Sequence, residues 1–453
     1  MAFLIGGANS AADTGFSVAN SCRFNDGDSA YMHKTPGGAG NMKTWTWNAW
    51  IKRGTMSATQ FIMEGYGGSA DETQVYISSG GAFAFYTIGT GMGDNKTISS
   101  TNLLRDPSAW YMLTVRVDTT DATANNRCRL YINGTEITYT NHDALTEDGD
   151  GAVNEAVIQY LGRRNAGDYF DGYMAEVCLV DGSSLAPTSF GEFNSDSPTI
   201  WQPIDVSGLS FGTNGYYLDF EDSSNLGNDA NGGTDLTEVN LAAADQATDT
   251  STNSFATMNN LIPGVSNITY SEGNLLVTQT TGAWVKATST FGISAGKWYW
   301  EAKWVGDNSG VGSWLIVGVD NNTTASTTSG YTSTSVGWKK NGNIGVATSL
   351  QTDIAAYAEG DVLSVALDMD NDAIYFRKNG ASWENSGDPT SGSDKTGAYS
   401  LPVANSTYFA TISPYDTSIA GMNFGGCPSF AISSSNADAD GYGNFEYAVP
   451  SGY

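Results

Sequence analysis

The chain is poor in positive charge. Its 453 residues include 20 Lys and Arg against 48 Asp and Glu, a formal net charge of −28, although only 15% of residues are charged. Proteins that bind nucleic acid neutralise phosphates with Lys and Arg, so this balance argues against a nucleic-acid partner. It equally disfavours an anionic membrane surface. The acidic excess is compatible with solubility in a salty medium, because salt screens the self-repulsion of the chain.

Long apolar runs and metal-binding patterns are also missing. No apolar stretch approaches the length of a bilayer span, so we expect no membrane insertion. The opening MAFLIGGANSAADTG has no basic region and only four consecutive apolar residues, so we expect no secretory signal and synthesis in a reducing cytoplasm. Cys22, Cys128, Cys178 and Cys427 have no CxxC or Cys/His spacing. We therefore expect buried free thiols rather than a zinc site or a disulfide framework.

Catalytic patterns are scarce. The two histidines, His33 and His142, lie in polar stretches without a nucleophile context, and solvated loop positions are expected for both. No Gly-rich loop ends in Lys-Ser or Lys-Thr to hold a phosphate. A retaining glucanase needs two neighbouring carboxylates. Glu64 stands alone, and Asp171 and Glu176 have an odd spacing that places them on opposite faces of a strand. We expect no enzymatic activity.

Gly, Asn, Ser, Thr and aromatic residues are abundant instead. The chain has 54 Gly, 12 Trp, 23 Tyr and 18 Phe, a composition typical of sheets and turns. Helical periodicity is nearly absent, whereas short alternating runs such as WYMLTVRVD (110–118) recur between Gly, Asn and Asp. In TWTWNAW (44–50), Trp45 and Trp47 share one face and Trp50 lies on the other. The pattern predicts an all-β protein made of antiparallel sandwiches.

One short motif occurs twice. CRLYINGTEI (128–137) and AIYFRKNGASW (373–383) are both alternating runs broken by Asn-Gly. Asn-Gly favours the type I′ turn of a tight hairpin, which needs positive φ at its two central residues. In each copy two alternate residues should face a core: Leu130 and Ile132, and Ile374 and Phe376. We interpret the two copies as equivalent hairpins in two separate sandwiches.

The distribution of basic residues marks a join between the two sandwiches. No Lys or Arg occurs from Asn165 to Val285, and much of this stretch is low in the apolar residues that a core needs. GYYLDFEDSS (215–224) is an exception that could pair as a strand with a neighbour. The predicted parts are an N-terminal lead (1–19), a first sandwich (20–193), an acidic connector (194–265), a second sandwich (266–430) and a C-terminal tail (431–453).

The order of segments carries two family resemblances. Residues 20–193 resemble a laminin-G/concanavalin A-like jelly roll through FNDGDSAYM, WTWNAWIKRG, WYMLTVRVD, CRLYINGTEI, IQYLGRRN and the closing YFDGYMAEVCLVDGSSL. This resemblance implies a two-sheet sandwich that often binds carbohydrate. Residues 273–430 resemble a SPRY domain through GKWYWE, SVGWKKNGNIG, GDVLSVALDMDNDAIYFRKNGASW, TYFATISPY and MNFG. That resemblance implies a bent sandwich that binds proteins or peptides through its loops and is not catalytic.

The whole chain is similar to structural proteins of marine bacteriophage virions, through its domain combination, its opening MAFLIGGANS and its Gly/Thr/Asn-rich acidic connector. This resemblance implies a tail fibre, head fibre or surface decoration whose lead contacts other virion proteins and whose sandwiches bind a host-surface glycan or protein. Weak single contacts would favour a homo-oligomer. Two alternatives stay open: a secreted or cell-surface pair of carbohydrate-binding modules of a marine bacterium, and a purely structural capsid or tail decoration or adaptor without a ligand.

Aromatic and basic side chains near strand ends and loops are the candidate ligand contacts, because recognition surfaces of sandwiches gather there. They are Tyr66, Tyr86, Tyr139, Arg164 and Tyr169 in the first sandwich, and Trp304, Trp314, Tyr331, Trp383 and Tyr415 in the second. For each aromatic, ordinary packing is the alternative.

Calcium is the one cofactor with support in the sequence. TEDGDGAVNE (146–155) offers Glu147, Asp148, Asp150 and Glu155, which are hard oxygen donors on turns. The more ordinary interpretation is that these acids stabilise turns through bonds to the backbone.

Overall fold

The fold is built from strands and contains no α-helix in the described residues. A computed structural model of the chain describes residues 15–89, 91–262, 267–307, 314–324, 332–352 and 354–453. Its helices are six single turns of 3-10 type: Asp26–Asp28, Ala124–Asn126, Pro187–Ser189, Ala243–Asp245, Glu384–Ser386 and Gly392–Asp394. No helix in this part of the chain is long and apolar enough to cross a membrane. The all-β prediction is confirmed, and the chain divides into two compact units at Ser254/Phe255.

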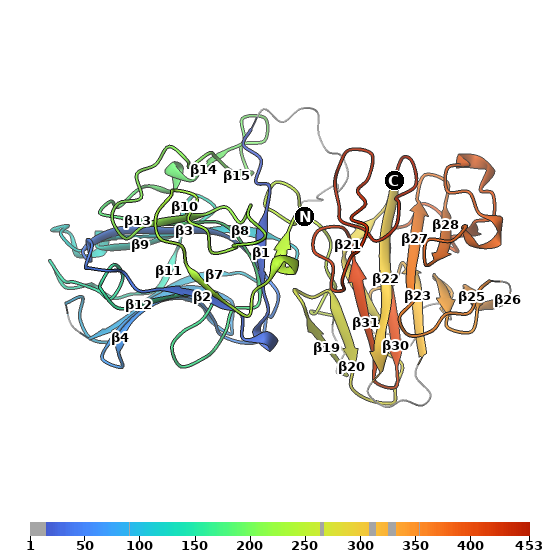
Figure 1. The fold of residues 1–453 in the computed structure, drawn as a ribbon, viewed down its shortest axis with the longest axis horizontal. Coiled ribbons are helices and arrows are strands. Elements are labelled where there is room, and N and C mark those ends of the chain that lie inside the picture. Colours follow the sequence, from blue (N-terminus) through green and yellow to red (C-terminus); the bar gives the residue numbers. More distant parts are fainter. Residues whose placement is uncertain (1–14, 90, 263–266, 308–313, 325–331, 353) are drawn as a thin grey trace. The chain divides into compact units, whose positions relative to one another are not determined.

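The first unit, here called the first sandwich, ends at Ser254 and contains two large antiparallel sheets and a third sheet of two short strands (Figure 1). Sheet A comprises β10 (Thr135–Glu136), β9 (Cys128–Ile132), β8 (Trp110–Asp118), β3 (Thr44–Arg53), β13 (Gly172–Asp181), β1 (Ser21–Phe24) and β18 (Gln246–Ala247), with β16 (Tyr216–Leu218) also paired to β13. Sheet B comprises β11 (Tyr139–His142), β7 (Lys96–Leu103), β6 (Ala82–Gly89), β5 (Asp71–Ile77), β4 (Gln60–Gly68), β12 (Ile158–Leu161), β2 (Tyr31–Lys34) and β17 (Thr237–Val239).

Sheet A is buried on both faces. Trp45 and Trp47 point into the core between the two sheets, together with Leu130 of the first Asn-Gly hairpin. Trp50 points the other way, into a second apolar layer with Trp201 and Phe211. Side chains alternate between the two faces along a strand. β3 therefore supplies Trp45 and Trp47 to one layer and Trp50 to the other. Sheet B therefore carries the outer face that is left to meet solvent.

The predicted acidic connector is largely part of the first sandwich. Between β14 (Gly191–Phe193), β15 (Trp201–Pro203) and β16, the chain runs over the outer face of sheet A, as Figure 1 shows. β17 and β18 then complete the edges of sheets B and A. The apolar residues of this stretch are few, but most of the larger ones are buried, and the Gly, Asn and Asp between them form turns. The low apolar content of this stretch therefore led to its prediction as a connector, although it covers sheet A. The predicted strand in GYYLDFEDSS is confirmed as β16.

The carboxylates of this covering segment pair with basic residues from the start of the chain. Lys52 donates to Asp249 at 2.6 Å, with both side chains buried, and Arg23 donates to Asp245 at 3.0 Å. A buried charge is tolerated only when it is paired in this way. The acids of the stretch without Lys or Arg are therefore paired with basic residues of β1 and β3.

The second unit, here called the second sandwich, begins at Phe255 and also contains two antiparallel sheets. Sheet F comprises β19 (Ile268–Ser271), β20 (Leu276–Gln279), β31 (Ser418–Asn423), β22 (Lys297–Asp307), β27 (Val362–Asp368), β28 (Ala373–Lys378) and β29 (Tyr399–Ser400). Sheet G comprises β21 (Ala287–Ile293), β30 (Tyr408–Tyr415), β23 (Trp314–Asp320), β24 (Ser335–Lys339), β25 (Asn343–Val346) and β26 (Ser349–Thr352).

The predicted C-terminal tail packs on the outer face of sheet F. Phe445 lies edge-on to Tyr299, with ring centroids 5.0 Å apart, in an apolar cluster with Tyr375. Beside it, fully buried Glu301 accepts hydrogen bonds from the backbone N–H groups of Glu446 and Tyr447, both at 2.9 Å. This segment, predicted as a separate tail, is therefore part of the second sandwich.

Both Asn-Gly turns form as predicted, but only the first closes a hairpin, between β9 and β10; the chain directly after the second turn does not pair with β28, whose partners are β27 and β29. Asn133 and Gly134 have φ of 48° and 74°, and Asn379 and Gly380 have φ of 50° and 67°. Each Asn also exchanges two hydrogen bonds with the next strand: Asn133 with the backbone of Met112, and Asn379 with that of Val362. All four cysteines are buried and free, which confirms the expectation for the thiols.

One buried carboxyl of the first sandwich is held in its neutral form. Glu176 sits at a bulge of β13, with φ of 51°, and its Oε2 accepts a hydrogen bond from Tyr217 Oη at 2.8 Å. Burial raises the pKa of Glu176 to about 8, with smaller raising contributions from the charges of Asp219, Glu221 and Asp205, and the Tyr217 hydrogen bond opposes this rise. The folded chain therefore retains a proton that the unfolded chain loses above the ordinary glutamic acid pKa.

We predict that Glu176→Gln removes a pH dependence of stability. Because the folded pKa is raised, the stability linked to Glu176 is fully present below the unfolded pKa and is lost as pH rises to about 8. The loss is on the order of 3 kcal/mol by pH 7. Urea unfolding from pH 4 to 9 should show a shallower decline for Glu176→Gln than for the parent. Parallel profiles would contradict this account.

We also predict that Glu301→Ala releases the C-terminal segment. The substitution leaves the N–H groups of Glu446 and Tyr447 without their acceptor, and should lower the free energy of unfolding by about 3 kcal/mol. Hydrogen–deuterium exchange should quicken in peptides covering 431–453. Glu359→Ala, at an exposed position, is the matched control and should change neither quantity. Unchanged protection of the segment in Glu301→Ala would show that its apolar contacts alone hold it.

Candidate functional site

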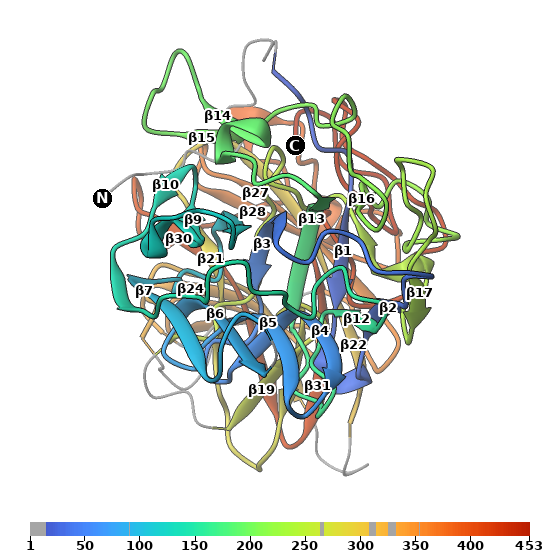
Figure 2. The ribbon, with the colours of Figure 1, turned by 90° about the vertical axis from the view of Figure 1, so that its left-hand side faces the viewer.

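The outer face of sheet B is the most distinctive surface of the first sandwich. We call it the aromatic face, and define it by Tyr31, His33, Phe61, Glu64, Tyr66, Glu72, Gln74, Tyr76, Tyr86 and Tyr160, with Arg163, Arg164 and Tyr169 from the loop after β12. Figure 2 views the strands β5, β6, β4, β12 and β2 that carry it. Most of these rings are half-buried, so each keeps an accessible edge or face.

Strand register places these side chains in rows across the sheet. Tyr86, Gln74, Glu64, Tyr160 and His33 are cross-strand neighbours on β6, β5, β4, β12 and β2. Side chains directly opposite each other in a sheet lie within contact distance. The result is a row in which an amide and a carboxylate stand between aromatic rings.

Arg163 holds three of the rings in place. Its guanidinium carbon lies 4.6 Å from the ring centroid of Tyr31, 5.1 Å from that of Tyr160 and 5.0 Å from that of Tyr169. Its nitrogens donate to Tyr169 Oη and to the backbone carbonyls of Arg164 and Asn165. These contacts combine cation–π attraction with hydrogen bonds, so the rings are ordered before any ligand arrives.

Two carboxyl groups meet on this face through one amide. Gln74 Nε2 donates to Glu64 Oε1 at 2.7 Å and to Glu72 Oε2 at 2.8 Å, so these two oxygens lie within 5.5 Å of each other, the sum of the two bond lengths. Burial raises the pKa of both carboxyls. The sequence analysis treated Glu64 as an isolated acid, because Glu72 and Gln74 come near it only through the β4–β5 pairing.

The spacing of these acids resembles that of a retaining glycosidase, in which the two carboxyls lie about 5–5.5 Å apart. Glu64, however, is only 1% exposed, and its second oxygen accepts a hydrogen bond from the backbone N–H of Asn165. A general acid must reach the oxygen of the bond that it cleaves. The geometry therefore fits Glu64 as an anchor for the Arg163 loop better than as a catalyst. Asp171 and Glu176 have separate partners, Thr55 and Tyr217.

The structure brings most of the candidate residues of the first sandwich together. Tyr66 and Tyr86 lie on strands of the aromatic face, and Arg164 stacks on Phe61 at 4.6 Å above it. Tyr169 contacts Arg163. Tyr139 lies elsewhere: its Oη is bonded to Glu136 and its ring packs on the core between the sheets.

Several contributors to the face were missed. Both histidines lie in strands rather than loops: His33 is on the face, whereas His142 stacks on Tyr139 with its Nε2 2.9 Å from the carbonyl oxygen of Cys128. Tyr31 and Tyr160 were also overlooked. Alternate residues of one strand, such as Tyr31 and His33, share a face of the sheet. Which side chains of other strands lie beside them is known only from the strand order.

The second sandwich gathers three of its candidates at one end. Trp314 and Tyr415 are cross-strand neighbours, and Lys340 Nζ lies 5.8 Å from the Trp314 ring and 4.7 Å from the Trp304 ring. Trp304 is nevertheless 2% exposed and donates to the carbonyl of Gly306, so it packs rather than binds. Trp383 lies apart, under Arg377 in the cluster that holds the C-terminal segment. Tyr331 lies outside the described residues.

The calcium candidates do not converge. Glu147 pairs with Arg127 at 2.7 Å, and Asp148 pairs with Lys43 at 3.6 Å. Asp150 and Glu155 lie near each other, and Glu155 shares a hydrogen bond with Asp71, so burial and these neighbouring acids raise the pKa of Glu155. Within the described ranges, no group of three or more His, Cys, Asp or Glu side chains is arranged to hold a metal ion.

Comparison with known families agrees with the two sandwiches. Residues 26–186 match the family model described as the concanavalin A-like lectin/glucanases superfamily, and residues 297–426 match the SPRY domain model. No curated protein sequence is similar to the chain. The covering segments, 187–254 and 427–453, lie outside both matched regions.

Solved structures show partial similarity. The SPRY domain of human HERC1 is 18% identical over 37% of this chain and 95% of its own, with a TM-score of 0.29. A protein of Bacteroides ovatus described as carbohydrate-binding is 19% identical over 49% of this chain and 58% of its own, with a TM-score of 0.32. The CBM40 of Ruminococcus gnavus IT-sialidase, bound to α2,3-sialyllactose, is 16% identical over 31% of this chain and 87% of its own, with a TM-score of 0.23.

We predict that calcium does not stabilise the first sandwich through the 146–155 turn. Two of the four acids are already paired with Arg127 and Lys43, so they are not free to ligate. Millimolar calcium should leave the thermal midpoint of the full chain unchanged relative to EDTA. Glu155→Gln should raise the midpoint slightly, because it removes a like charge beside Asp71. A calcium-dependent rise that Glu155→Gln abolishes would contradict this view.

Proposed function

We propose that the protein binds neutral glycans through the aromatic face and does not cleave them. The observation that supports glycan binding most directly is a row of cross-strand neighbours, Tyr86, Gln74, Glu64, Tyr160 and His33. Arg163 holds the adjoining rings in place. Aromatic rings offer apolar surfaces for the C–H face of a sugar, and neighbouring amides and carboxyls hydrogen-bond its hydroxyls. The match of residues 26–186 to a lectin-containing superfamily supports the same choice.

We expect a neutral ligand because the two arginines of the aromatic face, Arg163 and Arg164, are already engaged by other side chains. Arg163 is engaged by three rings and three hydrogen bonds, and Arg164 forms an ion pair with Asp168 at 2.6 Å. Neither is left to neutralise a sugar acid, and the chain as a whole carries a formal charge of −28. An acidic glycan would therefore meet repulsion without compensation.

The setting we propose is the surface of a bacteriophage particle, where the chain would present its sandwiches to the host. The domain combination and the opening MAFLIGGANS, which resemble those of marine phage structural proteins, support this setting. A particle with many copies would turn weak sugar contacts into stable attachment. Antibodies against the chain should label purified phage particles in electron micrographs. Recovery of the chain only from a bacterial surface would instead favour the pair of carbohydrate-binding modules.

We predict that Tyr66→Ala and Tyr160→Ala each weaken glycan binding at least tenfold, which corresponds to about 1.4 kcal/mol. A glycan array probed with the full chain should identify a neutral ligand, and calorimetry should then give the affinities. Tyr442→Ala, an exposed tyrosine of the second sandwich, is the matched control and should bind as the parent does.

Three results would contradict the proposal. The first is unchanged affinity in both aromatic-face variants; the second is a preference for acidic over neutral glycans. The third is the appearance of new reducing ends when the ligand is incubated with the chain and their absence with Glu64→Gln, which would make the Glu64–Glu72 pair catalytic.

A further inference from the structure

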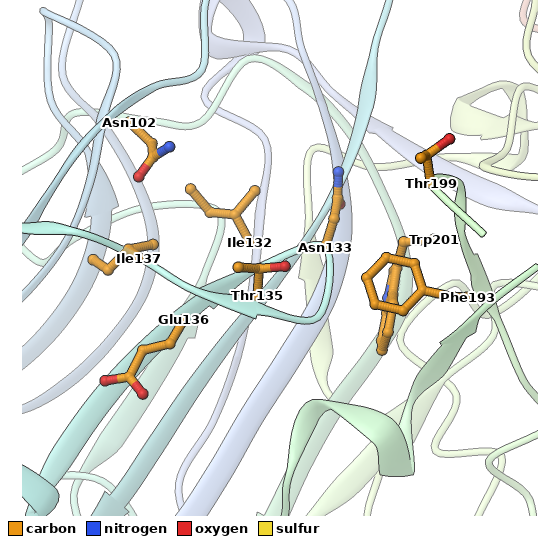
Figure 3. A pocket seen from close by; sticks show the side chains of 9 residues that line it. All are labelled: Asn102, Ile132, Asn133, Thr135, Glu136, Ile137, Phe193, Thr199 and Trp201. Carbon is orange, nitrogen blue, oxygen red and sulfur yellow. The ribbon is translucent and has the colours of Figure 1, made fainter.

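A separate pocket lies at the tip of the first Asn-Gly hairpin, remote in sequence from the strands of the aromatic face. It has a volume of about 240 Å³. It is lined by Asn102, Ile132, Asn133, Thr135, Glu136, Ile137, Phe193, Thr199 and Trp201 (Figure 3). Pockets for drug-sized ligands measure about 300–1,000 Å³, so this one suits a smaller ligand, about the size of one sugar ring.

One wall of the pocket is a fixed aromatic pair. Trp201 lies against Gly134 so closely that a Cβ at this glycine would come within 2.3 Å of the indole ring, and its Nε1 lies 3.1 Å from Met112 Sδ. Phe193 stands edge-on to Trp201, with ring centroids 4.9 Å apart. Trp201 is 8% exposed, whereas Phe193 is 48% exposed, so Trp201 supports the ring that Phe193 presents.

The other walls offer hydrogen-bonding groups at defined positions. Asn133 uses its Oδ1 to accept the N–H of Met112 at 2.8 Å, which leaves its amide nitrogen to donate. Glu136 is held by Tyr139 Oη at 2.9 Å and by Arg129 at 3.5 Å. Asn102 is exposed at the opposite rim.

The exposed apolar residues of the first sandwich lie in the segments that line the pocket. In the described part of the first sandwich, the large apolar residues that stay exposed are Leu103, Phe193 and Ile200. Phe193 lines the pocket, and the other two are sequence neighbours of lining residues, Asn102 and Trp201. Phe193 is therefore an exposed apolar ring that faces the pocket.

We propose that this pocket binds a single neutral sugar ring, as a second glycan site of the first sandwich. The C–H face of the ring would lie on Phe193, and its hydroxyls would reach the amide of Asn133, Asn102 and Thr199. A mixed wall of one aromatic ring and several uncharged polar groups suits a polyhydroxylated ring better than an aliphatic side chain, which would leave those polar groups unpaired. The pocket shares no residue with the aromatic face, so it does not require that face to bind.

The test uses the full chain and methyl glycosides of glucose, galactose, mannose and N-acetylglucosamine as probes. Saturation-transfer NMR should detect at least one glycoside on the parent and on Tyr66→Ala. Phe193→Ala and Asn102→Ala should each weaken that binding at least tenfold. Leu261→Ala, an exposed apolar residue of the second sandwich, is the matched control. Unchanged thermal midpoints would show that the variants remain folded, as expected for exposed positions.

The variants in which glycoside binding is lost distinguish the pocket from the aromatic face. Binding that survives Tyr66→Ala and is lost in Phe193→Ala supports the pocket. Binding lost only in Tyr66→Ala overturns the pocket while leaving the aromatic face in place. Failure of every glycoside, with saturation of a leucine-containing dipeptide instead, also overturns the proposal and assigns the pocket to peptide.

Discussion

In each sandwich an aromatic ring rests on the glycine of an Asn-Gly turn, and this contact joins the returning chain to the sheet. Trp201 lies on Gly134 in the first sandwich and Tyr447 lies on Gly380 in the second, where a Cβ would come within 2.3 Å and 2.4 Å of the ring. The glycine serves twice, because it supplies positive φ for the turn and leaves room for the ring. The asparagine before it secures the turn to the next strand. The repeated motif is therefore a tight turn together with a docking place for a later segment of the chain.

This docking decides which sheet faces are left open. A sandwich buries one face of each sheet in its core, and its two outer faces remain. The segment after residue 184 buries the outer face of sheet A, and the C-terminal segment buries that of sheet F around Glu301. Each covering segment is also held by a buried charged residue of the sheet: Lys52 pairs with Asp249 in the first sandwich, and Glu301 accepts hydrogen bonds from Glu446 and Tyr447 in the second. In the first sandwich the aromatic rings are consequently presented on sheet B.

The parts of the fold that depend on local patterns could be predicted from the sequence, and the parts that depend on strand order could not. Alternation placed Trp45 and Trp47 on one face of a strand and Trp50 on the other, and Asn-Gly located both tight turns. The covering segments were missed because their apolar residues are sparse, and nothing local indicates that Trp201 packs on a turn 67 positions earlier. Among the site residues, Tyr66, Arg164 and Tyr169 could be named, but their meeting with Tyr160 and Glu64 requires the β4–β12 pairing.

The scarcity of basic residues has a structural consequence for recognition. In the first sandwich Arg23, Lys52 and Arg127 pair with Asp245, Asp249 and Glu147, and Arg163 is surrounded by rings. These cations stabilise the fold, and with 20 Lys and Arg against 48 Asp and Glu the chain keeps an excess of negative charge. A surface of this kind repels anions and gains little from cations at the salt concentrations that screen exposed charges. Specificity must then come from ring stacking and from hydrogen bonds to uncharged groups, which are the two interactions that the aromatic face and the hairpin pocket both provide.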